Sequence, residues 1–290
     1  MNTEKTAICA ILRNEHSYLK EWIDYHLSIG IDYIYLYEDV GDTHEEICKE
    51  YDNVFLTPIK DFVTYEHSFA KQACVYDKFI EQYKDKITYA FFIDLDEFVM
   101  FEDGYDLKSL IAICNDMGGG VLLPWKMYGA EGLVKKPNTN VLDTYKTPSS
   151  CVFTQEEMTD KTVYKTFCRT DRGPMEGFHA HPVAKTLVPW GTKNIYSVCW
   201  INHYITKSWE EWCEKLFVRR QNIPVRILND FFRYNPDMLD IKDELREFAK
   251  NYSNNIDFNF YTALNEIAEK NKERVHQEVM EVLNRDYGNW

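Results

Sequence analysis

The sequence has no paired-cysteine motif, no long apolar run and no excess of positive charge. Its 8 cysteines form no C-x-x-C pair, so a zinc site or a disulfide framework is poorly supported. No apolar run reaches the ~20 residues that a membrane-spanning helix needs, and no basic segment with a long apolar stretch begins the chain. These absences lead us to expect a protein of the reducing cytoplasm rather than a membrane-anchored enzyme.

Negative charge dominates the composition. Asp and Glu number 47 against 33 Lys and Arg, which gives a formal net charge of −14. Such an acidic chain disfavours nucleic acid or an anionic lipid surface as the main partner. Hydrophobic residues make up 45% and aromatic residues 15% of the chain, which allows a large core and argues against long disordered stretches.

The first half of the chain alternates short apolar runs, typical of buried strands, with stretches whose apolar residues recur at helical spacing. This alternation indicates an α/β fold with a parallel sheet and right-handed crossovers. Residues 126–200 show an irregular pattern, and the chain beyond them is predicted to be rich in helix. We predict strands at 6–12, 31–37, 54–58, 90–93 and 121–125, and helices at 18–29, 43–51, 68–83, 107–114, 208–220 and within 254–283.

Three acidic residues interrupt the apolar run 89–100 where the predicted strand ends. Asp94 and Asp96, two positions apart in an extended segment, would point to the same side, and Glu97 follows them. Ligands of open α/β sheets bind outside the carboxyl ends of the strands. Mg²⁺ or Mn²⁺, which take oxygen ligands and often bind substrate phosphates, would relieve the repulsion between two carboxylates. The acids could instead cap the next turn, so a nucleotide-diphosphate site and a structural role both stay open here.

Polar residues also follow the other predicted strands. Arg13, Asn14 and Glu15 come after the first strand, and Asp39 comes after the second. A parallel sheet would bring them to the edge that carries Asp94. Asp39 could bond a uracil or a ribose. Each residue alone could be a cap or a surface charge, but their coincidence favours a nucleotide site.

A second polar stretch precedes the predicted helix at 208–220. His203 could supply an imidazole ligand to a metal, and Lys207 could neutralise phosphate charge as the sugar bond breaks. Lys165, beside an apolar stretch, is a candidate contact for substrate or phosphate. The structural alternatives are a hydrogen-bonded core histidine and a solvated lysine.

In this order and spacing, the motifs resemble glycosyltransferase family 92 and its bacterial relatives, close to the family 2 nucleotide-sugar transferases. The resemblance spans roughly residues 7–220. It is carried by Arg13-Asn14-Glu15, Glu21-Trp22, Tyr25-His26, Gly30, Asp94-Leu95-Asp96-Glu97-Phe98, Asn202-His203-Tyr204 and Lys207-Ser208.

The resemblance implies a GT-A type fold, in which a Rossmann-like mixed sheet flanked by helices binds the UDP part and a smaller half binds the acceptor. We therefore expect residues 1–220 to form the glycosyltransferase domain. Within it, residues 1–100 would be the nucleotide-binding half and residues 101–220 the acceptor-binding half. Residues 221–290 would form a helical C-terminal extension.

The resemblance also implies Mn²⁺ or Mg²⁺ held by Asp96 with help from His203, with Asp94 nearer the ribose and the waters of the metal. It further implies an inverting displacement, in which the acceptor hydroxyl attacks the anomeric carbon and a carboxylate removes its proton. The implied donor is a UDP-sugar that carries a hexose. The implied acceptor is a cell-surface glycan or a lipid-linked precursor, which would allow peripheral association with the inner membrane face.

The acceptor side is less clearly marked in the sequence. Trp125 and Tyr128 resemble a family stretch near the acceptor. No motif marks the catalytic base, and Glu176 and Glu131 are candidates because they lie in loops where an acceptor should enter. The sequence makes no prediction of the oligomeric state.

Two other interpretations stay open. A nucleotidyltransferase or phosphoryl transferase would use the same acids for two-metal chemistry, but it usually has a glycine-rich phosphate loop near the amino terminus, which residues 7–15 lack. A non-catalytic carbohydrate-binding protein would bind glycan without metal or nucleotide. The density of polar residues at one predicted sheet edge counts against this second alternative.

Overall fold

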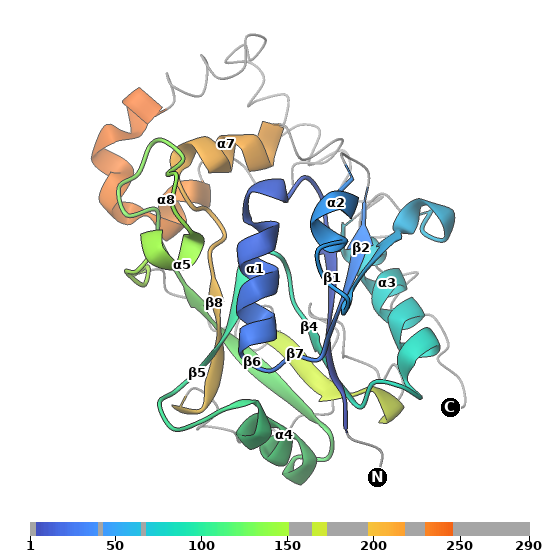
Figure 1. Ribbon diagram of the computed structural model, residues 1–290. Coiled ribbons are helices and arrows are strands. Elements are labelled where there is room, and N and C mark those ends of the chain that lie inside the picture. Colours follow the sequence, from blue (N-terminus) through green and yellow to red (C-terminus); the bar gives the residue numbers. More distant parts are fainter. Residues whose placement is uncertain are drawn as a thin grey trace. The chain divides into compact units, whose positions relative to one another are not determined.

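The computed structural model describes residues 4–39, 43–64, 68–150, 164–172, 197–217 and 230–245. Within these ranges the chain packs as two compact units, of which the first contains a mixed sheet of eight strands. The strands are β1 (Thr6–Leu12), β2 (Tyr33–Glu38), β3 (Val54–Pro58), β4 (Tyr89–Phe92), β5 (Glu97–Phe101), β6 (Gly120–Met127), β7 (Tyr164–Arg169) and β8 (Cys199–His203) (Figure 1).

Helices α1 to α4 belong to the unit with the sheet, and α5, α7, α8 and η4 belong to the second unit. No helix in the described ranges combines the length and the apolar composition that crossing a bilayer requires. The helices are α1 (His16–Ser28), α2 (Glu45–Cys48), α3 (Ser68–Tyr83), α4 (Leu107–Asp116), α5 (Val141–Thr144), α7 (Trp209–Phe217) and α8 (Asp230–Tyr234), with 3₁₀ turns η1 (Ile59–Asp61), η2 (Thr170–Arg172) and η4 (Pro236–Ile241).

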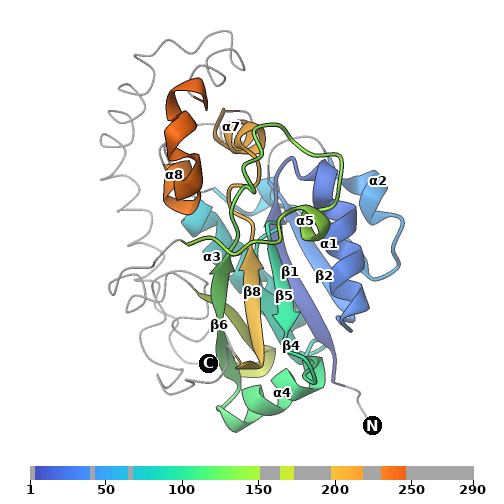
Figure 2. The same ribbon diagram turned by 90° about the vertical axis from the view of Figure 1, so that its left-hand side faces the viewer.

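The strand order is β3-β2-β1-β4-β7-β6-β8-β5. The first four strands run parallel, whereas β7 is antiparallel to both β4 and β6. Figure 2 shows β6, β8 and β5 side by side, and these three strands are the last in the strand order. The predicted α/β fold, a Rossmann-like mixed sheet flanked by helices, is confirmed.

Strand β1 is buried on both faces. Ala7 and Cys9 belong to one buried cluster with Val75 and Phe79 of α3. Ile8 points to the opposite face, since side chains alternate along a strand, and it is also fully buried. Burial on both sides explains why this strand is continuously apolar in the sequence.

Helix α1 is fastened to the backbone of β5. The Trp22 indole donates a hydrogen bond to the Glu97 carbonyl at 2.7 Å, and the Tyr25 hydroxyl donates to the Val99 carbonyl at 2.6 Å. His26 Nε2 accepts from the Val99 N–H at 3.3 Å. Burial lowers the pKa of His26 from 6.5 to about 3, so its imidazole is neutral. These contacts fix the strand that begins at Glu97.

The structure differs from the predicted elements in three places. Strand β5 was not predicted separately, because the apolar run 89–100 hides the turn that divides it. The segment described above as irregular contains β7, which lies inside the sheet. Asp94 and Asp96 do not lie on an extended segment, since the Glu97 N–H donates to the Asp94 carbonyl at 3.2 Å and closes a turn. The helix predicted within 254–283 lies outside the described residues.

Candidate functional site

The parallel strands β1, β2 and β4 end at one edge of the sheet. Leu12, the last residue of β1, pairs with Glu38, the last residue of β2, and Cys9 of β1 pairs with Phe92 of β4. The polar residues that follow these strands are therefore brought to the same edge. This placement confirms the prediction that Arg13, Asp39 and Asp94 share a sheet edge.

Asp39 is surrounded by positive charge at this edge. Its carboxylate oxygens accept hydrogen bonds from Lys71 Nζ at 2.9 and 2.8 Å, and one oxygen lies 3.9 Å from the Arg13 guanidinium. The Asp39 N–H donates to the Leu12 carbonyl at 3.0 Å. Lys71, on α3, was not singled out in the sequence.

The loop between β1 and α1 is held by a buried histidine. His44 Nε2 accepts from the Glu15 N–H at 2.9 Å, and His44 Nδ1 lies 2.9 Å from the Glu38 carboxylate. Burial lowers the pKa of His44, which favours the neutral ring that can accept the Glu15 bond. Asn14 precedes Glu15 with φ of 53°, a left-handed conformation that asparagine tolerates better than most residues.

The acidic turn after β4 is tied together by hydrogen bonds from two other elements. Gln72 Nε2, on α3, donates to Asp94 Oδ1 at 2.8 Å, and Lys165 Nζ, on β7, donates to Asp94 Oδ2 at 2.7 Å. The Asp94 N–H donates to Glu97 Oε2 at 2.9 Å. The same Glu97 oxygen lies 3.5 Å from Lys165 Nζ. The Gln72 amide, the Lys165 ammonium and the Glu97 carboxylate therefore all contact Asp94.

Glu97 and Lys165 are both fully buried. Burial raises the pKa of Glu97 well above its usual range, and the attraction of Lys165 opposes this effect. Burial would lower the pKa of Lys165, but the carboxylates of Asp94 and Glu97 outweigh it and raise the pKa. Lys165 therefore stays charged inside the protein. Its Nζ lies 5.7 Å from the centre of the Trp125 ring, within cation–π range.

Asp96, Glu97 and His203 form a group with ligand atoms suited to a metal. Each offers one ligand atom, and these atoms lie within 4.8 Å of one another. Two carboxylate oxygens and an imidazole nitrogen are a donor set that fits Mn²⁺, and the carboxylates fit Mg²⁺. Asp96 and His203 were predicted as ligands, whereas Glu97 was not. Asp94, also predicted as a ligand, is not part of this group.

Tyr128, predicted to contact the acceptor, and Glu131, a candidate base, lie in the second compact unit. The Tyr128 ring is 4.8 Å from that of Tyr204, and Tyr128 is mostly buried. Glu131 has φ of 55° and accepts hydrogen bonds from the Lys146 N–H at 2.8 Å and from the Thr147 hydroxyl at 2.9 Å. In this structure the Glu131 carboxylate thus fixes the loop at 146–147.

Lys207 is mostly buried and has φ of 51°. It directly precedes Ser208, whose hydroxyl donates to Glu211 at 2.7 Å while the Glu211 N–H donates back to it at 3.4 Å. These two bonds cap the first turn of α7 at Ser208. Glu176, the other candidate base, lies outside the described residues.

The chain matches the family model of glycosyltransferase family 92 over residues 6–278. The chain belongs to glycosyltransferase family 92. It is therefore a glycosyltransferase, and the resemblance seen in the sequence is confirmed. The comparison of this family 92 enzyme with curated proteins gives no match.

Two solved structures show a weak likeness to the family 92 enzyme. One is 4-diphosphocytidyl-2C-methyl-D-erythritol synthase from Anaerococcus prevotii DSM 20548, with 10% identity, a TM-score of 0.30, and coverage of 58% of this chain and 71% of that chain. The other is HddC from Yersinia pseudotuberculosis, with 8% identity, a TM-score of 0.30, and coverage of 69% and 89%. Likeness at this level supports no assignment of function.

Sequence reasoning missed three residues of this enzyme that hold the predicted ones in place. Gln72 and Lys71 lie on one turn of α3 and reach Asp94 and Asp39, respectively. His44 reaches the backbone of Glu15. The helical pattern of 68–83 gave the helix but no signal for which of its polar residues would point at the sheet edge.

Proposed function

We propose that this family 92 enzyme moves a hexose from a UDP-sugar to a hydroxyl of a cell-surface glycan or lipid-linked acceptor, with inversion and with a divalent cation. The observation that carries the proposal is the gathering of Asp39 and the acidic turn at Asp94 where parallel strands end. Ligands of open α/β sheets bind at that edge. A nucleotide with a diphosphate would find acceptors for its hydroxyls and cations for its phosphates there.

The donor-binding role is supported by the mixture of charges at the edge. Arg13 and Lys71 supply positive charge near Asp39, which a diphosphate requires. The Asp39 and Asp94 carboxylates would accept hydrogen bonds from the base or the ribose. The proposed donor-binding residues are Arg13, Asn14, Glu15, Asp39, Asp94 and Lys207, and Lys165 contributes to the donor site through its bond to Asp94.

Asp96 and His203, joined by Glu97, would hold Mn²⁺ or Mg²⁺. A cation bound there would offset the charge that develops on the departing diphosphate. Asp94 remains a predicted metal ligand, although it does not belong to the group of Asp96, Glu97 and His203. Replacing His203 by Ala should weaken the Mn²⁺ dependence of donor binding.

On the acceptor side we propose Trp125 and Tyr128 as contacts and either Glu131 or Glu176 as the base. A base for an inverting displacement must reach the acceptor hydroxyl within hydrogen-bond distance, so loss of the right carboxylate should lower kcat and leave donor binding intact. The variants Glu131→Gln and Glu176→Gln, measured separately, distinguish the two. The proposed setting is the cytoplasm, with peripheral association at the inner membrane face.

The test of the proposal is UDP release from a panel of UDP-sugars, with and without Mn²⁺. We expect Mn²⁺-dependent release by the wild type, a fall of about 100-fold or more in Asp96→Asn, and no change in Asp171→Asn, a control with an exposed carboxylate. Full activity of Asp96→Asn would contradict the proposed site. Release of pyrophosphate from a nucleoside triphosphate, without UDP release, would favour the nucleotidyltransferase alternative.

A further inference from the structure

Asp94 is held from both sides by residues of two different elements. Gln72 of α3 bonds Oδ1 at 2.8 Å, and Lys165 of β7 bonds Oδ2 at 2.7 Å. An aspartate at a strand end can otherwise turn about both of its side-chain torsions. Donors on each of its two oxygens fix the plane of the carboxylate as well as its direction.

Packing alone does not explain a lysine at this position of the sheet. Lys165 and Phe167 lie on the same face of β7, because they are two residues apart. Phe167 packs against Phe91 of β4, with ring centres 4.3 Å apart. An apolar side chain at residue 165 would extend this packing without the cost of burying an ammonium. The fully buried Lys165, one register position beyond the last pair of β4 and β7, is instead directed to Asp94.

A second lysine–aspartate pair in the same unit can be compared with the pair of Lys165 and Asp94. Lys5 Nζ lies 2.7 Å from Asp32 Oδ1, the same distance that separates Lys165 and Asp94. Lys5 and Asp32 precede β1 and β2, so they lie at the opposite, amino end of those strands. The Lys5 side chain is 36% exposed, whereas that of Lys165 is 0% exposed. The two pairs have the same length, and they differ in the burial of the lysine and in the edge of the sheet at which they lie.

We infer that Lys165 and Gln72 are positioning residues for the donor site, which hold Asp94 in the orientation in which it meets the nucleotide. Lys165 then acts through Asp94 and does not touch the donor itself, because its side chain has no exposed surface. Binding groups must be held within about 0.5 Å of their productive geometry to contribute fully, and their supporting hydrogen bonds provide that precision. The inference rests on the proposed function, since it requires a nucleotide at Asp94.

The experiment is a calorimetric titration of UDP at saturating Mn²⁺ into the wild type, Gln72→Leu, Lys165→Met and Lys5→Met. We expect Gln72→Leu to weaken UDP binding by about tenfold, the size of one hydrogen bond to a charged group. Lys165→Met should weaken it by at least as much, and Lys5→Met should leave it unchanged. Gln72 is only half-buried on a helix, so Gln72→Leu keeps the test valid even where Lys165→Met does not fold.

A double variant separates positioning from a general structural role. If Gln72 acts through Asp94, Gln72→Leu should add less than about twofold to the weakening already caused by Asp94→Asn. Lys165→Arg, which keeps a charged donor, should recover part of the affinity lost in Lys165→Met. A loss of stability alone would produce neither of these two patterns of UDP affinity.

The outcomes for this inference and for the proposed function differ. Unchanged UDP affinity in Gln72→Leu, in a protein whose wild type binds UDP, overturns the positioning role and leaves the function standing. Fully additive losses in the Gln72→Leu, Asp94→Asn double variant also overturn it. Absence of UDP binding by the wild type overturns the UDP donor and this inference together.

Discussion

Two lysine–aspartate pairs of equal length lie at opposite ends of the parallel strands, and only one of them has a buried lysine. Lys5–Asp32 stands at the amino ends of β1 and β2, and Lys165–Asp94 stands at the carboxyl end of β4. Both nitrogen–oxygen distances are 2.7 Å. The difference between them is in their surroundings rather than in their bond.

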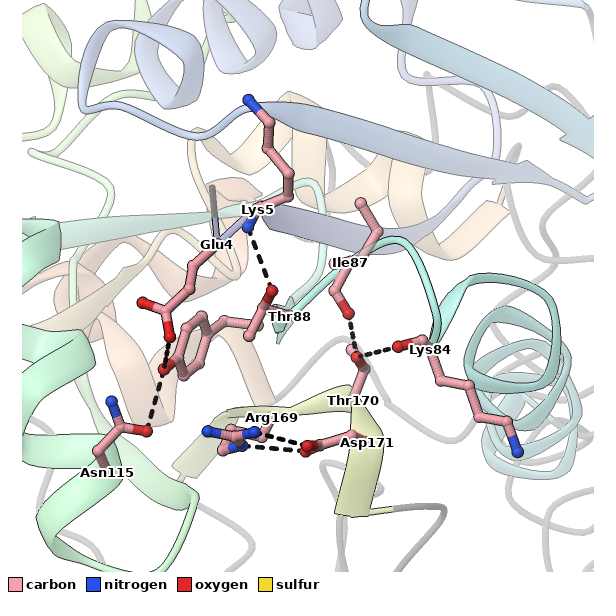
Figure 3. A network of polar contacts seen from close by, with 10 residues as sticks. Glu4, Lys5, Lys84, Ile87, Thr88, Asn115, Arg169, Thr170 and Asp171 are labelled. Carbon is pink, nitrogen blue, oxygen red and sulfur yellow. Dashed lines mark hydrogen bonds and ion pairs between the residues drawn. The ribbon is translucent and has the colours of Figure 1, made fainter. Parts of the chain in front are cut away.

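The amino end carries a dispersed polar network (Figure 3). The Tyr89 hydroxyl lies 3.0 Å from Asn115 Oδ1 and 3.3 Å from Glu4 Oε1, two acceptors for its one proton, and the Arg169 guanidinium donates to Asp171. Arg169 and Asp171 both have exposed surface, so water screens their pairing. This exposed pair therefore contributes little to stability.

The carboxyl end concentrates its charge around one buried ammonium. Lys165 contacts two carboxylates, and Glu97 is as fully buried as the lysine. A buried ion pair gives no advantage in stability over well-packed apolar residues of similar volume. The comparison shows that the buried charges of this chain lie at the edge of the sheet where a ligand is expected. Proteins commonly depart from apolar packing at their functional sites, which agrees with this location.

The largest expected effect is on stability, and it is tested by replacing the lysine of each pair with methionine. Lys165→Met should lower the free energy of unfolding by about 3–5 kcal/mol, because it leaves the buried Glu97 and the partly buried Asp94 without their counter-charge. Lys5→Met, at a partly exposed pair, should have a far smaller effect. Urea denaturation of the two variants gives the comparison. Equal losses of unfolding free energy in the two variants would show that burial of the lysine does not determine its contribution to stability.

Mild acid should lower the free energy of unfolding through His26 before it affects the contribution of Asp32. The pKa of His26 is lowered from 6.5 to about 3, so below pH 6.5 the unfolded chain takes up a proton that the folded chain does not. The free energy of unfolding should therefore fall by up to about 1.4 kcal/mol per pH unit from pH 6.5 towards pH 3. For Asp32, burial would raise the pKa, but bonds from Lys5 and Thr6 outweigh it and lower the pKa below 3.8, so its contribution is lost only in stronger acid.

The measurement is urea denaturation at several pH values between 6.5 and 4.5, on the wild type and on His26→Gln. Glutamine keeps a donor and an acceptor but does not titrate in this range. The variant should show a flatter dependence on pH. Identical slopes for the two proteins would show that His26 does not cause the acid sensitivity.

Removing a carboxylate should relieve part of the loss caused by Lys165→Met. The double variant Lys165→Met, Glu97→Gln should recover about 1–3 kcal/mol relative to Lys165→Met, since one uncompensated buried charge is gone. A double-mutant cycle on the free energy of unfolding measures this coupling. Strict additivity would show that Lys165 and Glu97 do not interact energetically.

The smallest effect is expected from Arg169→Gln, at the other end of β7 from Lys165. Its exposed pairing with Asp171 should contribute less than about 1 kcal/mol to stability, and UDP binding should not change. Thermal melting and a UDP titration of the same preparation check both statements. A weakened UDP affinity would show that the two ends of β7 are not independent.

Most of the site edge could be predicted from the sequence, because local patterns mark it. The apolar runs of β1 and β4 are followed by polar residues, and α1 ends just before Gly30, which has φ of +101°, close to the predicted end at residue 29. Parallel pairing then follows from the alternation of strands and helices. The shared edge of Asp39 and Asp94 is a consequence of that topology.

The rest could not be predicted, since it depends on contacts between residues distant in the sequence. Strand β7 was hidden because Lys165 gives it a charged residue at a position that is buried in the fold. Nothing in the pattern of α3 distinguishes Gln72 from the other polar residues of that helix. Its role appears only when Asp94, 22 positions later, is placed beside it.

The most direct test of the account is calorimetric titration of UDP into the wild type and Asp96→Ala, each with and without Mn²⁺. The account predicts binding by the wild type that requires Mn²⁺ and is lost in Asp96→Ala, while the variant keeps the melting temperature of a folded protein. UDP binding that is independent of both Mn²⁺ and Asp96, or no binding by the wild type at all, would contradict the claim that this sheet edge is a metal-dependent nucleotide-sugar site.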